Sequence, residues 1–486
     1  MWVCDFVRRN PVAYNMMILT VTGIITKTID FAFRSYYSKQ LGAEGMGIFS
    51  LIMSVFGIIL SLSSAGMGVA VSRLVSIKEE QGNREGSVGV VKSALQTVFC
   101  VGAVCVSFVF LFAEWLSQSI LNDMRCVTGL LCIAPASLFM GISYCIKGYF
   151  YGIRKVIIPA ESEFVEQAVK IASISYFLGK GLYIGTEYGC AGVMAGLTIG
   201  EFSSCVYLLI RYKFHSKGRK SQGCPVKGIL NMTIPMTASA VGNSFFRMIE
   251  DVKIIDGFER FGKENAVGEY GLIKGMTMPL IVFPLNLISS FMALLSPEVS
   301  RATEKGKFSG IAKRIGKIGL FFGFLVFVIF SAFPEELSLM VYGTTEGAKY
   351  IAPLALLCPL MVIDSLSSSM LGGLGEQKKL LKYSLWDSAL RLFIVWVILP
   401  YLGNFAIILM FFSSNALTCT LTAGKIHKMA ESFIPLSSIT RAFFCSLIVI
   451  LLSEIFIPDS LSGAYLIASI LAVTALYALL YKKSKS

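Results

Sequence analysis

Long apolar stretches recur along the whole chain, and they constrain its fold more than any other feature. Each is about 20 residues long, which is the length an α-helix needs to cross the hydrocarbon core of a membrane. They begin near residues 12, 46, 90, 128, 157, 189, 229, 271, 311, 350, 380, 403, 438 and 461. The connections between them are mostly short, and none could fold as a separate soluble domain. The sequence therefore predicts an all-α integral membrane protein with about 14 transmembrane helices.

Composition excludes the main soluble classes. Of the 486 residues, 55% are hydrophobic and only 15% are charged, whereas soluble proteins carry about 25% charged residues. A soluble enzyme, a nucleic-acid-binding protein and a disordered chain are therefore not expected. The first ten residues lack the apolar stretch and small-residue cleavage site of a signal peptide. We expect the first helix to be retained as a membrane span.

The net charge of +13 mostly indicates how the chain is oriented in the membrane. Most of the 43 Lys and Arg residues lie on the two ends of the chain and on alternate connections. The opposite connections hold only Lys39, Arg125, Lys180, Lys253, Arg260, Lys263 and Lys349. By the positive-inside rule, both termini are predicted to be cytoplasmic. This distribution leaves no basic surface to suggest a nucleic acid partner.

The chain also contains an internal repeat. At a shift of 221 residues, Gly45–Ile52 matches Ala266–Ile273, and a shift of 224 pairs Pro135 with Pro359. Each copy has six expected helices, so both enter the membrane with the same orientation and form a parallel repeat. We predict two six-helix lobes around a central cavity, an N-lobe at residues 1–222 and a C-lobe at 223–430. Residues 431–486 would form two further helices.

Charged residues within the expected spans are candidates for function. Each costs about 2.5–3.5 kcal/mol at the centre of a membrane helix, so it should face protein or water. The basic ones are Lys27, Arg34, Lys170, Arg247, Lys274 and Arg391, and the acidic ones are Asp30, Glu163, Glu166, Glu201, Glu250, Asp251, Asp364 and Asp387.

The first helices of the two copies carry matching charges. Lys27, Asp30 and Arg34 have a spacing that places them on one helix face. At a shift of 220, Arg247 and Glu250 repeat the start of this face. Together with Lys274, which lies in the eighth expected helix, these cations could hold a phosphate or pyrophosphate in a central cleft. The alternative is that Lys27 with Asp30, and Arg247 with Glu250, only neutralise one another.

A second set of charges is also duplicated. Glu166 and Lys170 correspond, at a shift of 221, to Asp387 and Arg391. Each pair has i, i+4 spacing with the acid N-terminal, the favourable order on a helix. We interpret both pairs as structural clamps, with coupling to Na⁺ or H⁺ as the alternative role. The lone acids Asp364 and Glu201 are weaker candidates for binding a proton or a sodium ion.

Patterns for catalysis, nucleotides or metals are not convincing. Gly257–Lys263 has the outline of a phosphate-binding loop, but Glu264 replaces the required Ser or Thr and no strand precedes it. No CxxC pair suggests a zinc or redox site. We therefore expect no enzyme activity, no ATP binding, no metal and no cofactor other than a coupling ion. The small-residue stretches Ser64–Gly68 and Gly148–Gly152 favour close helix packing or bending.

Four short stretches of the sequence resemble a known family. Ile25–Arg34 and Leu41–Ile52 are similar to the opening of the stage V sporulation protein B family, and Gly148–Arg154 followed by Glu166–Lys170 is similar to its fourth-to-fifth helix segment. This family belongs to the multidrug/oligosaccharidyl-lipid/polysaccharide exporter superfamily. Fourteen helices also resemble the MurJ-type lipid II flippases, whose last two helices help to form a groove for the lipid tail.

The resemblance implies a flippase for undecaprenyl-pyrophosphate-linked saccharides, such as the peptidoglycan precursor lipid II. MurJ-type proteins carry arginine in helix 2, whereas this chain has no charge there until Arg73. A capsule or teichoic-type saccharide is therefore an alternative cargo. The expected partners are this lipid, membrane lipids and cell-wall synthesis proteins. Two other functions stay open, namely a cation-coupled multidrug antiporter of the same superfamily and a non-transporting scaffold for cell-wall synthases.

Overall fold

The computed structural model describes residues 11–217, 226–288, 308–430, 433–456 and 464–483, and these residues form helices and connections without any strand. The chain packs as two compact units, Met1–Val252 (unit 1) and Lys253–Ser486 (unit 2). This boundary falls within a helix, 30 residues beyond the end of the N-lobe expected from the repeat. The three-part division of the chain stays a prediction.

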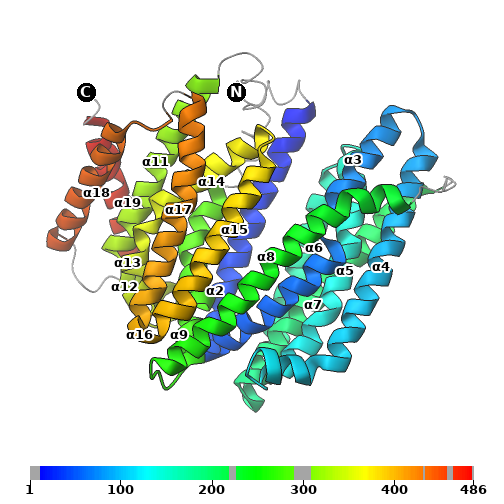
Figure 1. The fold of residues 1–486 in the computed structure, drawn as a ribbon, viewed down its shortest axis with the longest axis horizontal. Coiled ribbons are helices and arrows are strands. Elements are labelled where there is room, and N and C mark those ends of the chain that lie inside the picture. The colour runs from blue at the N-terminus through cyan, green and yellow to red at the C-terminus, as the bar shows by residue number, and fades with distance from the viewer. Residues whose placement is uncertain (1–10, 218–225, 289–307, 431–432, 457–463, 484–486) are drawn as a thin grey trace. The chain divides into compact units, whose positions relative to one another are not determined.

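Unit 1 is built from long helices that run side by side (Figure 1). They are α2 (Pro11–Ser64), α3 (Met67–Glu80), α4 (Arg84–Trp115), the π-helix η1 (Leu116–Ile120), α5 (Cys126–Gly152), α6 (Ile157–Ile184), α7 (Thr186–Ser216) and α8 (Val226–Arg260), whose last residues belong to unit 2. The helix α2 covers two of the expected spans, and these are separated only by a break at a single residue, Gly42. Gly42 has φ 68° and ψ −175°, a conformation open only to glycine.

The break between α2 and α3 lies in one of the small-residue stretches. Gly66 has φ 74°, and the carbonyl oxygen of Ala65, left without its helical donor, accepts a hydrogen bond from Thr237 Oγ1 at 3.0 Å. A Cβ added to Gly148 would lie 2.6 Å from the carbonyl oxygen of Gly68. The two small-residue stretches therefore pack directly against each other. The expectation of bending and close packing is confirmed.

Glycines also bring α6 and α7 into backbone contact. Gly192, Gly196 and Gly200 recur every four residues on one face of α7. A Cβ on Gly192 would lie 2.7 Å from the carbonyl oxygen of Phe177, and a Cβ on Gly200 would lie 2.8 Å from Lys170 Cβ. Within a membrane, such close approach maximises van der Waals contact, which replaces the hydrophobic effect as the force between helices.

We expect Gly196→Val to lower the free energy of unfolding by about 1–3 kcal/mol, because overpacking displaces the neighbouring helix. A Cβ at this position would lie 2.4 Å from Ile174 Cγ1 and 2.8 Å from the Ile174 backbone nitrogen. Thermal unfolding of the purified protein in detergent measures the effect. The matched control is Gly179→Val on α6, where no atom lies within 4 Å of the added Cβ. Equal losses in the two variants would contradict this packing argument.

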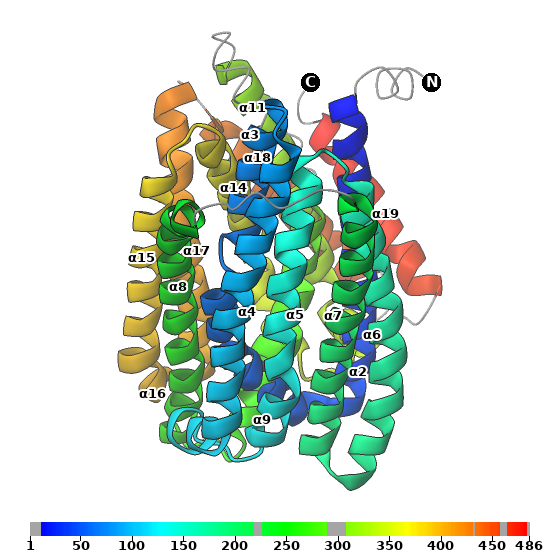
Figure 2. The same ribbon diagram turned by 90° about the vertical axis from the view of Figure 1, so that its right-hand side faces the viewer.

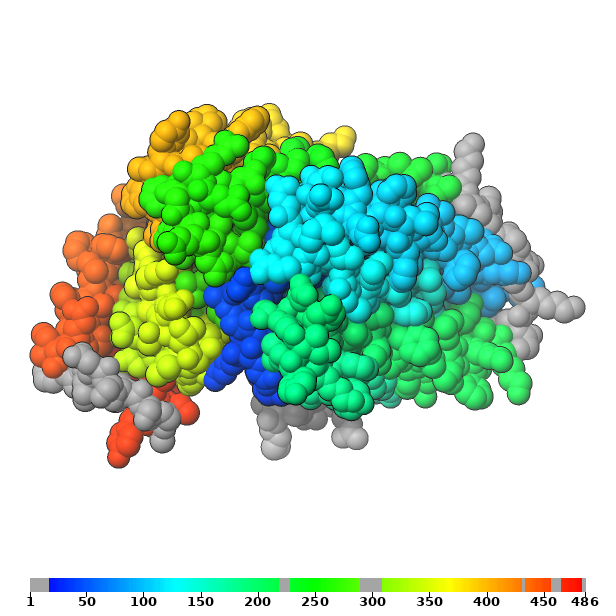
Figure 3. Space-filling model, turned by 90° about the horizontal axis from the view of Figure 1, so that it is seen from below, coloured from blue at the N-terminus to red at the C-terminus, as the bar shows by residue number. Residues whose placement is uncertain are grey.

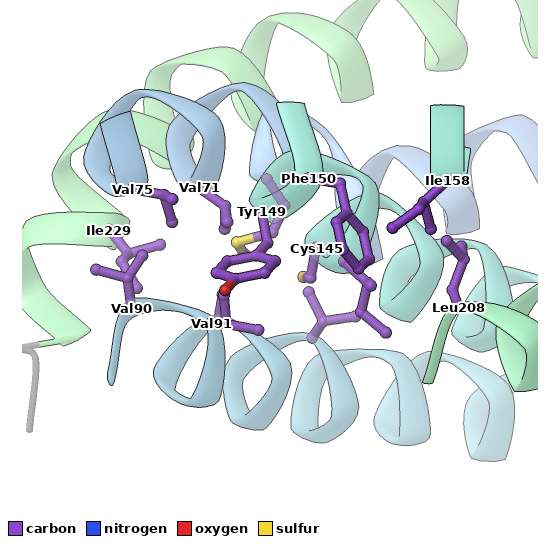
Figure 4. Close-up of a cluster of buried hydrophobic side chains, with 14 residues drawn as sticks. Val71, Val75, Val90, Val91, Cys145, Tyr149, Phe150, Ile158, Leu208 and Ile229 are labelled. Atoms are coloured by element: carbon purple, nitrogen blue, oxygen red, sulfur yellow. The ribbon is translucent and has the colours of Figure 1, made fainter. Parts of the chain in front are cut away.

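The apolar core of unit 1 joins several helices around two aromatic rings (Figure 4). Tyr149 and Phe150 of α5 are fully buried, with ring centroids 5.3 Å apart in an edge-to-face arrangement. Val71 of α3, Val91 of α4 and Leu208 of α7 belong to the same cluster. These contacts fix one end of α5, the helix that contributes lysine and hydroxyl groups to the site described below.

Unit 2 contains shorter and more interrupted helices. They are α9 (Ala266–Tyr270), the π-helix η2 (Gly271–Thr277), α11 (Phe308–Ala332), α12 (Pro334–Tyr342), α13 (Ala348–Ala355), α14 (Leu357–Gly373), α15 (Gln377–Phe393), the π-helix η3 (Ile394–Ile398), α16 (Leu399–Leu402), α17 (Asn404–Ala430), α18 (Leu436–Phe456) and α19 (Ala464–Lys483). After η2 the helix continues to Ile288. The pair α13 and α14 is bent by 56°, beside Pro353 and Pro359, whose rings disrupt regular helix geometry.

The connections of unit 1 alternate between its two ends. In Figures 1 and 2 the turns from α3 to α4 and from α5 to α6 lie at one end, and those from η1 to α5 and from α6 to α7 lie at the other. Figure 3 is seen from the second end. Arg154 and Lys155 lie in the turn from α5 to α6, and Arg84 begins α4 just after the turn from α3. Which of the two ends faces the cytoplasm stays a prediction.

Ten helices in the described ranges are long and apolar enough to span a membrane, or eleven if the bent pair α13 and α14 is one span. The segments α6 and α8 are not among them, and α6 carries Glu161, Glu163, Glu166 and Lys170 in its first half. The chain is thus a multi-pass membrane protein. The count of 14 stays a prediction.

Candidate functional site

A polar cavity of about 420 Å³ lies within unit 1, between α2, α5, α6 and α7. We call it the unit 1 polar cavity. Its charged lining residues are Lys27, Asp30, Lys147, Glu163, Glu166 and Glu201, and Gln167, Ser143 and Tyr144 add neutral polar groups. A polar cavity is unusual within a membrane lobe, because each buried charge needs a compensating partner.

Lys170 adjoins this cavity and connects two helices. Its Nζ lies 2.5 Å from Asp30 Oδ1 of α2 and 3.8 Å from Glu166 Oε1 of its own helix. The Lys170 side chain is 10% exposed, and that of Glu166 is 16% exposed. A second pair, Lys147 Nζ and Glu163 Oε1 at 3.8 Å, joins α5 to α6. Lys170 and Glu166 are mostly buried, so removing one of them would leave a costly charge on the other, whereas the Asp30 side chain is 50% exposed.

Two sets of charged residues that the sequence analysis treated separately lie together at this cavity. The face with Lys27 and Asp30 was expected to meet substrate, and the pair Glu166 and Lys170 was expected to form a clamp. Glu166 and Lys170 form an ion pair, and Lys170 also pairs with Asp30; the role of this group as a clamp stays a prediction. Lys27 and Asp30 line the cavity together, but the ion pair of Asp30 is with Lys170. No local spacing signals this contact, because it joins residues 140 positions apart.

Arg34 lies one helical turn beyond Asp30 and outside the lining of the cavity. Its guanidinium carbon lies 5.5 Å from the centroid of the Phe49 ring. Phe49 follows the break at Gly42, so this cation–π contact joins the two halves of α2.

Unit 2 contains its own cluster of charges around one aromatic ring. Lys274 Nζ of η2 lies 5.7 Å from the centroid of the Phe411 ring, and Arg391 Cζ of α15 lies 5.6 Å from the same centroid. The Ser414 hydroxyl donates to Asp387 Oδ1. We call these five residues the unit 2 charged cluster. It brings Lys274 and Arg391 to one ring, an association that the sequence pattern does not predict; the pairing of Asp387 with Arg391 stays a prediction.

Two other predicted residues lie on α8. Arg247 is exposed, whereas Glu250 is 3% exposed. Both belong to unit 1, and Lys274 belongs to unit 2. The ring of four cations expected from the sequence therefore stays a prediction. The lone acid Asp364, on α14, accepts a hydrogen bond from Thr422 Oγ1 of α17 at 2.8 Å, which satisfies part of its carboxylate within unit 2.

Each unit also has an ion pair that links two helix starts, and sequence reasoning missed both. Arg125 Nη1 lies 2.5 Å from Glu44 Oε1 in unit 1, and Lys349 Nζ lies 2.8 Å from Glu269 Oε1 in unit 2. The repeat could have revealed them, since Arg125 falls on Lys349 at the shift that pairs Pro135 with Pro359. Hydrogen bonds to Asp123 and Glu44 raise the pKa of Arg125 above its usual value.

The described residues contain no group of three or more His, Cys, Asp or Glu side chains that could hold a metal ion. The polar groups in the unit 1 polar cavity and the unit 2 charged cluster are instead ammonium, guanidinium, carboxylate and hydroxyl groups. Such groups bind anions, exchange protons and stabilise one another.

Comparison with known proteins agrees with a membrane transport fold. Residues 12–303 match the model of the family described as polysaccharide biosynthesis protein. The chain is 24% identical over 443 residues to stage V sporulation protein B of Bacillus subtilis (strain 168), covering 88% of this chain and 86% of that protein. It also resembles a solved structure of the lipid II flippase MurJ in an inward closed conformation, with TM-score 0.73, 14% identity, and coverage of 96% and 98% of the two chains.

A second solved structure, an inward-facing multidrug resistance MATE family transporter of the MOP superfamily, covers 86% of this chain with TM-score 0.67 and 14% identity. The whole of this MATE chain is matched. Because the family model spans more than half of the sequence, the chain belongs to the polysaccharide biosynthesis protein family. It is a multi-pass membrane protein.

Proposed function

We propose that this protein is a flippase for an undecaprenyl-pyrophosphate-linked saccharide, lipid II or a related cell-envelope precursor. It would act by alternating access in the bacterial cytoplasmic membrane, with both termini cytoplasmic, and without enzyme activity. The observation that carries the proposal is the unit 2 charged cluster, where Lys274 and Arg391 lie within apolar spans. Cations at such positions are costly unless an anionic group or a function requires them.

The chemistry of a pyrophosphate fits these cations. Lysine and arginine both pair with phosphate oxygens, and a ring of Lys27, Arg34, Arg247 and Lys274 would neutralise its charge during passage. Asp30 and Glu250 would offset part of this positive charge in the empty site. An apolar pocket of about 300 Å³ in unit 2, between α11, α14, α17 and α18, has the lining that an isoprenoid chain would favour.

A cation-coupled multidrug antiporter is the second candidate. One observation favours it, namely that the unit 1 polar cavity presents four carboxylates, from Asp30, Glu163, Glu166 and Glu201. An acidic cavity attracts cationic compounds and repels a pyrophosphate. The lysines that approach the same carboxylates weaken this argument.

Native mass spectrometry of the purified protein tests the proposal. The protein is offered lipid II, another undecaprenyl-pyrophosphate saccharide, bare undecaprenyl phosphate and several cationic drugs. We expect selective retention of a pyrophosphate lipid by the wild type and its loss in Lys27→Ala/Arg247→Ala. The control Lys180→Ala removes an exposed cation of α6 and should bind as the wild type does. Retention of drugs, or lipid binding that is indifferent to the double substitution, would contradict the flippase.

A further inference from the structure

The two copies of the repeat differ in how one pair of helices is joined at its end. In unit 1, the start of α6 is linked to the end of α7 through Glu161. Its Oε2 atom accepts a hydrogen bond from the Tyr207 hydroxyl and lies 3.4 Å from Arg211 Nη2. The repeat aligns α6 with α15 and α7 with α17. The same contact would therefore be expected between the start of α15 and the end of α17.

In unit 2 both positions of this contact are lysines. At the shift of 221 residues that aligns the charge pairs of α6 and α15, Glu161 falls on Lys382. At a shift of 218, which aligns the glycines immediately before α7 and α17, Tyr207 falls on Lys425. Two cations thus stand where unit 1 has a carboxylate and a hydroxyl group. These two side chains cannot join the helices by themselves.

Positive charge accumulates at this end of unit 2, where α15 starts and α17 ends (Figures 1 and 2). Lys379 Nζ of α15 lies 2.5 Å from Glu376 Oε1, and it also lies next to the Lys425 side chain of α17. Lys382 and Lys428 follow on the same two helices, and both are exposed. Within the described ranges, only Glu376 forms an ion pair with any of these lysines. Because like charges repel at short range, an anion between the two helices would remove an unfavourable interaction.

The surface beside these lysines is suited to a lipid. Lys382 Nζ lies 4.9 Å from the centroid of the Trp386 ring. Trp386 is 49% exposed, Leu381 and Leu385 are also exposed, and no residue of α15 is buried. Tryptophan is enriched where the hydrocarbon core meets the headgroups, and lysine extends its ammonium group from there towards the phosphates. Cations at headgroup level beside exposed apolar side chains favour an anion that carries acyl chains.

We propose that the start of α15 and the end of α17 together bind the headgroup of one anionic membrane phospholipid. Its phosphodiester lies between Lys382 and Lys425, since lysine pairs with phosphate oxygens. There it takes the place that the Glu161 carboxylate has in unit 1, and it joins the two helices. The acyl chains lie along Leu385 and Trp386. The site goes beyond the proposed function and does not depend on it, because its ligand is a lipid of the surrounding membrane and not the cargo.

Native mass spectrometry with phosphatidylglycerol and the zwitterionic phosphatidylcholine tests the site. We expect the wild type to retain one phosphatidylglycerol in preference. Lys382→Gln/Lys425→Gln should bind this lipid about thirtyfold more weakly, which corresponds to about 1 kcal/mol for each lysine. The matched control Lys92→Gln/Lys317→Gln removes two exposed lysines of α4 and α11 and should bind as the wild type does. Equal affinity for phosphatidylglycerol in the two double variants would overturn the proposal.

Competition and a charge reversal identify the anion. An excess of inorganic phosphate or of lipid II should leave the phosphatidylglycerol bound, and its displacement by either one would assign the lysines to free phosphate or to the cargo and overturn the proposal. Lys382→Glu restores the acid of unit 1. It should release the phospholipid and should unfold in lipid-free detergent at a temperature no lower than the wild type, whereas retention of the phospholipid would contradict the site. If phosphatidylglycerol binds as expected but no lipid II is retained, the proposed cargo fails and this site stands.

Discussion

Replacing Lys170 by methionine is expected to lower the free energy of unfolding by about 1–3 kcal/mol, the usual effect of leaving a buried polar group unsatisfied, because Glu166 is mostly buried whereas Asp30 is half exposed and partly solvated. The methionine fills nearly the same volume, so the loss reports charge and not a cavity. Asp30 would lose its partner at 2.5 Å. Chemical denaturation in detergent, followed by circular dichroism, measures the effect.

The control and the rescue make this prediction specific. Lys180→Met removes an exposed lysine of the same helix, and we expect a change within about 1 kcal/mol. Adding Asp30→Asn and Glu166→Gln to Lys170→Met should recover most of the lost stability, because no ionised group of the triad then remains. A triple variant as unstable as the single one would show that Lys170 acts through packing alone.

The sequence predicted local features well because they depend on neighbouring residues. Apolar length predicted a chain of many membrane-spanning helices, although their number stays a prediction, and small residues predicted the bend at Gly66 and the close packing at Gly148. The spacing of Glu166 and Lys170 predicted their pairing on α6. The bend and the ion pair depend on residues within one or two helical turns, whereas the packing of Gly148 was predicted only as a tendency, without its partner Gly68.

Contacts between helices that are distant in the sequence could not be predicted from local patterns. The pairing of Asp30 with Lys170 depends on the packing of α2 on α6, which no single helix encodes. The contacts of Phe411 could not be predicted either. In the sequence it is an ordinary apolar residue of α17, and only the fold places Lys274 and Arg391 beside its ring. Glu201 could be found from the sequence as a lone acid in an apolar helix, but its lack of an ion-pair partner became visible only in the fold.

We expect Lys274→Met to weaken the binding of an undecaprenyl-pyrophosphate lipid by about tenfold to a hundredfold, since a hydrogen bond to a charged group contributes about 1.5–3 kcal/mol. Lys274 lies in a π-helix, an irregularity that is frequent at functional sites. The Phe411 ring limits where its ammonium group can lie. Titration with lipid II by native mass spectrometry measures the dissociation constant.

Three further variants separate charge from shape. Lys274→Arg keeps the positive charge and should bind within a few-fold of the wild type, because arginine also pairs with phosphate oxygens. Lys317→Met removes an exposed lysine of α11 and should have no effect. Phe411→Leu should weaken binding by up to about tenfold, the magnitude of a cation–π contact, because the ammonium group would no longer be held in place. If Lys274→Met bound lipid II as tightly as Lys317→Met, the cation of η2 would have no part in recognising the headgroup, and the cargo would have to be sought among compounds without phosphate.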